Sequence, residues 1–281
     1  MSNIAEFEKK HDFLVCVDSD GCAMDTMDIK HYRCFGPCMV DEWGLDEWRD
    51  AILDRWNEVN LYTMTRGINR FKGLALALAE INEKYRPIED VSDIVFWAEN
   101  SPELSNGALE RAIAEKPQSR SLPKALAWSI AVNKAITQLP ECEVKPFPLA
   151  REALELAHGR ADVAIVSSAN LGAVLEEWEK HGLLPHTDIV MAQNSGSKAA
   201  CIAALLEKGY KPENVVMCGD APGDLDAARK NGVFFFPILV RRERESWQEF
   251  MDTALDKLTS QSYGGEYHEA KKQAFVNNLS K

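Results

Sequence analysis

The sequence predicts an α/β fold in which a five-stranded, doubly wound parallel sheet carries a helical segment inserted after its first strand. Two observations predict it. After residue 144, short apolar runs alternate with segments of helical periodicity, and strands separated by single helices pair in parallel through right-handed crossovers. Between residues 28 and 143 the pattern is helical and contains no convincing strand.

Each expected strand is a short apolar run that turn residues bound. These runs cover residues 13–17, 162–166, 188–191, 214–218 and 233–240. The expected helices of the same half cover residues 149–158 and 171–181, begin at Lys198 and at Asp224, and end with an amphipathic helix from Trp247 to Leu258. We expect residues 260–265 to form a loop and the residues after them to form a polar tail.

The inserted segment shows several amphipathic helices. One apolar face carries Leu45, Trp48, Ile52, Trp56 and Val59 at steps of three and four residues. Tryptophans at this spacing are typical of a helical core rather than of a ligand-stacking site. Prolines after residue 144 favour a stiff return into the sheet half of the chain.

Composition restricts the class of protein. Of the 281 residues, 46% are hydrophobic and 27% are charged, which is ordinary for a globular enzyme of one large or two modest domains. The net charge of -12 argues against general binding of nucleic acid or of an anionic membrane, although a local basic pocket for a small phosphorylated ligand is compatible with it.

Location is predicted from the termini and the cysteines. The first ten residues are polar and acidic, without the apolar run of a signal peptide, and no stretch approaches about 18 consecutive apolar residues. The seven cysteines are most simply reduced thiols, and the Cys34–Cys38 pair lacks the second pair that a zinc site requires. We therefore expect a cytoplasmic protein, and we derive no oligomeric state.

Two carboxylates follow the first strand. Asp18 and Asp20 are separated by one residue and followed by Gly21. Two such acids repel each other unless a cation lies between them or one of them holds a proton. A buried parallel strand commonly ends at the ligand crevice, although an acidic turn that caps the next helix would give the same pattern.

Three later stretches extend this pattern. Ser167 and Ser168 follow the strand at 162–166, Lys198 opens a helix behind Ser197, and Asp220 and Asp224 follow the strand at 214–218. Gly219 is expected to allow a sharp exit from that strand. Together with Asp18, these acids suit a hard, all-oxygen Mg2+ site, and Asp224 could also be the N-cap of a helix ending near Gly232.

The order of acid pair, hydroxyl, lysine and acid pair resembles the haloacid dehalogenase superfamily over nearly the whole chain. The resemblance implies a Rossmann-like core at residues 1–27 and 144–281 and a helical, C1-type cap at 28–143. It also implies the phosphatase-like subgroup that contains β-phosphoglucomutase and phosphoglycolate phosphatase. Cys22 and Ala23 stand where relatives usually have Thr and Leu, and we interpret Cys22 as a packing residue.

The resemblance also assigns roles to the matched residues. Asp18 is implied as the nucleophile that becomes an aspartyl-phosphate, and Asp20 as the general acid and base. Mg2+ is implied to be bound by Asp18, the backbone carbonyl of Asp20, and Asp220. The remaining matched residues are implied to bind phosphate (Ser167, Ser168 and Lys198) or to support the site through the lysine (Asp224).

The expected function is Mg2+-dependent hydrolysis of a small phosphorylated metabolite. The presence of Asp20 argues against the dehalogenase and phosphonate-hydrolysing branches, which replace that acid. A phosphotransferase or mutase of the β-phosphoglucomutase type stays open, because residues 66–70 partly match its cap signature Lys-Gly-x-Ser-Arg. A catalytically silent protein that binds a phosphorylated ligand is the alternative from another class.

Arg66 and Arg70 are the candidate substrate residues of the cap. Arginines at the start of a helix oppose its dipole, which indicates an anionic partner. That partner could be a cap carboxylate such as Glu47 or Asp50, or it could be the substrate, on which a guanidinium forks two hydrogen bonds. The sequence does not name the substrate.

Overall fold

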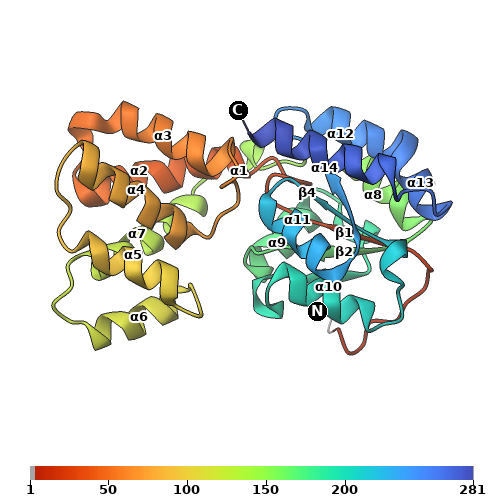
Figure 1. The fold of residues 1–281 in the computed structure, drawn as a ribbon, viewed down its shortest axis with the longest axis horizontal. Helices are drawn as coiled ribbons and strands as arrows, with labels where there is room; N and C mark the ends of the chain where they lie inside the picture. Colours follow the sequence, from red (N-terminus) through yellow and green to blue (C-terminus); the bar gives the residue numbers. More distant parts are fainter. Residues whose placement is uncertain (1–3, 281) are drawn as a thin grey trace. The chain divides into compact units, whose positions relative to one another are not determined.

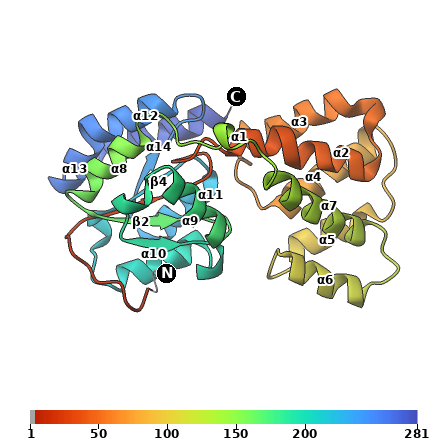
Figure 2. The ribbon, with the colours of Figure 1, turned by 180° about the vertical axis from the view of Figure 1, so that it is seen from behind.

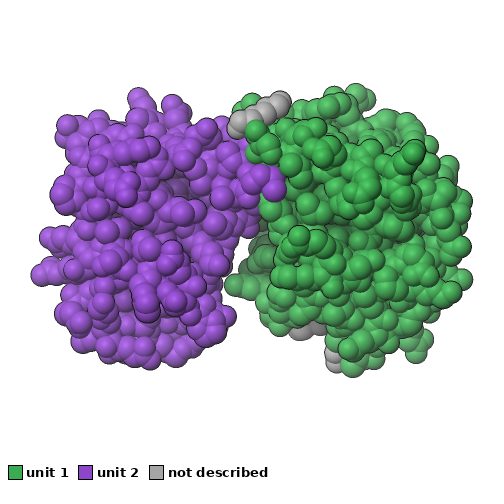
Figure 3. All heavy atoms as spheres, in the orientation of Figure 1, with its two compact units in different colours: residues 1–27, 141–281 green, residues 28–140 purple. Residues whose placement is uncertain are grey.

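A computed structural model describes residues 4–280 and divides the chain into two compact units (Figures 1 and 3). Unit 1 comprises residues 1–27 and 141–281, and unit 2 comprises residues 28–140. Each unit has its own cluster of buried apolar side chains. Each therefore has the hydrophobic core of an independent domain.

The sheet of unit 1 has five parallel strands in the order β3-β2-β1-β4-β5, which confirms the predicted fold class. The strands are β1 (Leu14–Val17), β2 (Asp162–Val166), β3 (Ile189–Met191), β4 (Val215–Gly219) and β5 (Phe234–Pro237). β5 is shorter than the predicted run of 233–240. The backbone N–H groups of Leu239 and Val240 donate to the side chains of Ser246 and Asn278 instead of to a strand.

Helices cover both faces of this sheet (Figures 1 and 2). One face packs against α8 (Ala150–His158), α9 (Leu171–Lys180), α12 (Glu243–Glu249) and α13 (Leu255–Thr259). The other face packs against α10 (Lys198–Leu206) and α11 (Pro222–Asn231). All four residues of β1 are buried, which explains why the strands appear as continuous apolar runs.

The prediction of a polar C-terminal tail is wrong. Residues Glu266–Leu279 form α14, which packs against the edge strand β5. His268 Nε2 accepts a hydrogen bond from the Phe235 N–H at 3.1 Å, and Asn278 binds both the N–H and the carbonyl of Val240. Phe275 is also buried. Side-chain bonds to Phe235 and Val240, together with the burial of Phe275 and Leu279, therefore hold this helix in place.

Unit 2 is helical, and its described residues contain no strand. Its α-helices are α2 (Gly36–Trp43), α3 (Arg49–Leu61), α4 (Arg70–Lys84), α5 (Val91–Asn100), α6 (Asn106–Glu115) and α7 (Ser121–Ile136), and α1 (Met27–Lys30) leads into them. Phe71 packs edge-on against Trp97 and Trp128, with ring centroids 5.1 and 6.2 Å apart. Trp56 is buried in the same core, as its spacing predicted, and the partly buried Trp48 packs against that core.

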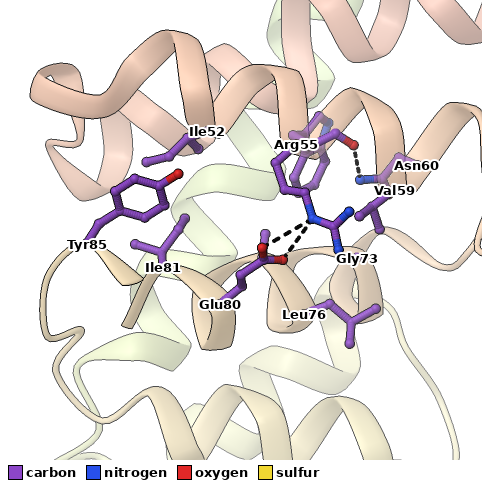
Figure 4. A pocket seen from close by; sticks show the side chains of 11 residues that line it. Ile52, Arg55, Val59, Asn60, Gly73, Leu76, Glu80, Ile81 and Tyr85 are labelled. Carbon is purple, nitrogen blue, oxygen red and sulfur yellow. Dashed lines mark hydrogen bonds and ion pairs between the residues drawn. The ribbon is translucent and has the colours of Figure 1, made fainter. Parts of the chain in front are cut away.

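Figure 4 shows a pocket of unit 2 that lies between α3 and α4. The Arg55 Nε donates to both carboxylate oxygens of Glu80, at 3.0 and 3.2 Å, across its rim. Neither Arg66 nor Arg70 lines this pocket.

No helix in residues 4–280 combines the length and the apolar character needed to span a membrane.

The two connections between the units run side by side where they leave unit 1. Met24 forms an antiparallel bridge with Pro146. The Asp25 N–H donates to the Lys145 carbonyl at 2.8 Å, and the Phe147 N–H donates to the carbonyl of residue 23 at 2.9 Å. The departing and the returning chain are thus tied to each other directly behind the first acidic motif.

Candidate active site

The acidic motifs meet at the carboxyl edge of the sheet. β1 lies between β2 and β4, with Val17 opposite Ile165 on one side and Cys218 on the other. Asp18 therefore follows the central strand directly, and its N–H donates to the Cys218 carbonyl at 3.0 Å. Asp220 begins the loop after β4 in the same layer, which is the edge where open α/β sheets bind ligands.

The loop after β1 is a tight turn. Gly21 has a φ of +84°, a conformation that glycine adopts without strain. The carbonyl of Ser19 accepts hydrogen bonds from the N–H groups of Cys22 at 3.2 Å and Met24 at 2.9 Å. Asp18 is 5% exposed, so its carboxyl group lies at the buried base of this turn.

Asp20 is held by a residue that sequence reasoning did not assign to the site. The Thr26 hydroxyl donates to Asp20 Oδ1 at 2.5 Å. Thr26 is fully buried, whereas Asp20 is only partly buried. This hydrogen bond to one carboxylate oxygen restricts the orientation of the second acid.

The second acidic motif needs its glycine for space. Gly219 ends β4 without a positive φ, and a Cβ atom at this position would overlap the Asp224 carboxyl group. The expected sharp exit from the strand is therefore not its role. Asp224 is also not the N-cap of α11, because Ala221 occupies that position. From the third helical position, Asp224 Oδ2 accepts a hydrogen bond from the Ala221 N–H at 3.0 Å.

Lys198 joins the two motifs. Ser197 caps α10 by accepting the Ala200 N–H at 3.2 Å, which places Lys198 in the first helical turn. The Lys198 Nζ lies 2.9 Å from Asp18 Oδ2 and 2.5 Å from Asp224 Oδ1. An ammonium group at a helix N-terminus opposes the dipole, and the two carboxylates offset this cost.

Burial dominates the electrostatics of the cluster. It raises the pKa of the Asp18 carboxyl group to about 7; the Lys198 ammonium opposes this rise and the charge of Asp224 adds to it. Burial and the charge of Asp220 likewise raise the pKa of Asp224. Burial opposes the charge on Lys198, but its two carboxylate partners outweigh this and raise its pKa. Lys198 is therefore charged, and its single positive charge does not offset the negative charge of the ionised carboxylates around it.

The carboxylates provide the oxygen ligands that a hard cation prefers. One oxygen each from Asp18, Asp220 and Asp224 can be chosen so that all three lie within 4.8 Å of one another, and all three residues are buried. Fully ionised, these acids and Lys198 carry two more negative than positive charges. A divalent cation with oxygen ligands, such as Mg2+, matches both the donor chemistry and this excess charge.

Comparison with known proteins identifies the family. The model of a family described as haloacid dehalogenase-like hydrolase matches residues 97–238, half of the chain. The chain belongs to the haloacid dehalogenase-like hydrolases. A search of curated proteins gave no match.

Solved structures support the fold of this hydrolase. A haloacid dehalogenase-like family hydrolase from Xanthomonas campestris shares 16% identity over 91% of this chain and 97% of that chain, with a TM-score of 0.52. A protein provisionally assigned as a phosphoglycolate phosphatase from Lactobacillus delbrueckii subsp. bulgaricus shares 14% identity over 91% of this chain and all of that chain, with a TM-score of 0.52. At these identities the similarity concerns the fold.

The two serines of the hydrolase differ in exposure. Ser167 follows β2 at the same sheet edge as Asp18 and is 3% exposed, and its hydroxyl accepts the Ala169 N–H at 3.1 Å. Ser168 is exposed.

Cys22 is fully buried with its Sγ 3.5 Å from the Cys218 carbonyl oxygen, and burial raises its thiol pKa well above the ordinary value. Cys22 therefore packs and does not act as a thiolate.

The two arginines considered for the cap lie in unit 2. Arg66 is 2% exposed, and its guanidinium donates to the Leu61 carbonyl at 2.8 Å and lies 3.9 Å from Asp28 Oδ1. Arg70 donates to Asn133 Oδ1 at 2.7 Å rather than to either carboxylate considered from the sequence, and burial lowers its pKa. Both guanidinium groups are thus held by groups within unit 2.

Proposed function

We propose that this hydrolase is a Mg2+-dependent phosphatase that cleaves a small phosphorylated metabolite through an aspartyl-phosphate on Asp18. The observation that carries the proposal is the Lys198 ammonium, which contacts Asp18 and Asp224 at once within a buried group of carboxylates. This arrangement combines a nucleophilic oxygen with fixed positive charge in a site of low dielectric constant.

In the proposed first step, an Asp18 carboxylate oxygen attacks phosphorus. The new O–P bond forms while the bond from phosphorus to the leaving oxygen breaks, and Asp20 donates the proton that the leaving oxygen requires. Water then attacks the aspartyl-phosphate, Asp20 accepts a proton from that water, and inorganic phosphate leaves with Asp18 restored. Thr26 orients Asp20 in both steps through the hydrogen bond to its Oδ1.

Lys198 neutralises part of the charge on the phosphoryl oxygens and on Asp18. Asp18, Asp220 and the backbone carbonyl of Asp20 are the proposed Mg2+ ligands, and Asp224 supports the site by holding Lys198. When bound, Mg2+ supplies the remaining positive charge at the phosphoryl group. Roles for Ser167 and Ser168 in phosphate binding, and for unit 2 in substrate choice, stay predictions.

The proposal is tested by release of phosphate from a panel of phosphorylated metabolites in the presence of Mg2+. Asp18→Asn should eliminate turnover, and Asp20→Asn should slow it by roughly 10²–10⁴-fold. Asp12→Asn is the matched control, because this side chain is 81% exposed and its loss should leave turnover unchanged.

Other outcomes identify the alternatives. A product that retains its phosphate at a new position would indicate a mutase. Binding of phosphorylated ligands without turnover would indicate a silent binding protein. Full Mg2+-dependent activity in Asp18→Asn would rule out the aspartyl-phosphate mechanism.

A further inference from the structure

A fully buried tryptophan contacts the residue between the two catalytic acids. Trp178 lies in α9, and its indole N–H donates to Ser19 Oγ at 2.9 Å. Both side chains are 0% exposed. A buried indole N–H requires an acceptor, and a hydroxyl acceptor in a core has no competing water. The contact therefore fixes Ser19 relative to α9.

A second buried tryptophan contacts the same loop from another helix. Trp247 lies in α12, and its indole N–H donates to the Cys22 carbonyl at 3.2 Å. Its ring packs edge-on against Phe250, whose ring packs edge-on against Phe236 of β5, with centroids 5.7 and 5.4 Å apart. Trp247 thus connects the loop to the aromatic core next to the edge strand.

The start of the loop depends on anchors of this kind. Asp18 is bound to β4 through its backbone, and the Phe147 N–H ties the far end of the turn to the returning chain by donating to the carbonyl of residue 23. Between these points the turn is closed by bonds to the Ser19 carbonyl. A rotation of this turn about Ser19 would move the Asp20 carboxyl group relative to that of Asp18. The Ser19 hydroxyl is the side chain at that pivot, and Trp178 holds it.

We propose that Trp178 and Trp247 are positioning residues, which orient the Asp18 and Asp20 carboxyl groups by holding Ser19 and Cys22. Only the kinetic consequence of this inference rests on the proposed function; the effect on the mobility of the loop does not. Catalytic groups must be held within about 0.5 Å of productive geometry, and a displacement of about 1 Å can cost about 10²-fold in rate. Trp178 acts closer to the acids, so its loss should have the larger effect.

The first test is the mobility of the loop, which needs no substrate. In Trp178→Phe, which keeps an aromatic ring but lacks the N–H, amide hydrogen exchange in a peptide covering residues 13–27 should increase at least several-fold. Ser19→Ala removes the acceptor with little change of volume and should produce the same local increase. Trp128→Phe is the matched control, because that fully buried indole donates to the Phe35 carbonyl at 3.1 Å within unit 2.

The second test is steady-state kinetics with a small phosphate ester and Mg2+. Trp178→Phe and Ser19→Ala should each lower kcat about 10-fold with KM nearly unchanged, because the acids are misaligned while substrate binding persists. In the Ser19→Ala background, Trp178→Phe should cause little further loss, since both changes remove one contact. Trp128→Phe should retain the parent kcat.

The outcomes separate the two proposals. If the parent protein turns over no phosphate ester, the proposed function fails, and exchange in residues 13–27 still decides whether the tryptophans hold the loop. Exchange that rises equally in Trp178→Phe and Trp128→Phe would overturn the positioning role. So would additive effects of Trp178→Phe and Ser19→Ala on kcat, or a loss of kcat of equal size in the Trp128 control.

Discussion

Replacing Gly219 by alanine tests the packing of the acidic cluster. The added Cβ would overlap the Asp224 carboxyl group, so this side chain must move. Asp224 would then lose its bonds from the Ala221 N–H and from the Lys198 ammonium. Hydrogen bonds to a charged group contribute roughly 1.5–3 kcal/mol each, and breaking a buried ion pair costs roughly 3–5 kcal/mol. We therefore expect Gly219→Ala to lower the free energy of unfolding by about 3–5 kcal/mol.

Gly223 provides the matched control within the same motif. It lies in α11, and a Cβ atom there would meet no atom within 4 Å. Gly223→Ala should be neutral or should stabilise the protein by up to about 1 kcal/mol. Urea denaturation followed by tryptophan fluorescence measures both variants, and phosphate release measures their activity. A Gly219→Ala protein with the stability and activity of the parent would refute the reasoning.

Three further results are expected. His268 accepts the Phe235 N–H as a neutral ring, and burial, aided by Lys272, lowers its pKa. The contribution of His268 to stability should therefore be complete above pH 6.5, the ordinary pKa of histidine. It should be lost as the pH falls from 6.5 towards the pKa of His268 in the folded protein. His268→Gln keeps an acceptor, so in this variant the free energy of unfolding should change less with pH over that range. Lys198→Ala should weaken binding of inorganic phosphate at least 10-fold by calorimetry, and parent-like affinity would remove its phosphate role. Removing divalent cations with a chelator should abolish phosphate release, and added Mg2+ should restore it; activity that persists would exclude the metal.

The sequence predicts the sheet well because its strands are buried on both faces. The run at 162–166 coincides with β2, and the other strands begin or end within a few residues of their predicted bounds. The acidic motifs were located for a related reason, since polar residues directly after buried strands stand out. The family that their order resembles implies that Asp18, Lys198 and Asp224 lie together, and the Lys198 ammonium contacts both carboxylates in the structure.

What the sequence could not predict depends on contacts between distant residues. The Trp178–Ser19 bond joins residues 159 positions apart, and nothing local in either segment indicates it. The need for glycine at position 219 arises from a side chain that returns to it from α11. α14 depends on the same kind of contact, because His268 accepts the Phe235 N–H and Phe275 packs edge-on against the Phe235 ring.

The placement of α14 has a consequence for folding. β5 is an edge strand, and unpaired backbone groups on such a strand can template pairing with another chain. His268 of α14 covers this edge by accepting the Phe235 N–H. The sheet can form before α14 docks, and a chain between these two steps leaves the edge open. We therefore expect this intermediate to be the species of the protein most prone to aggregate.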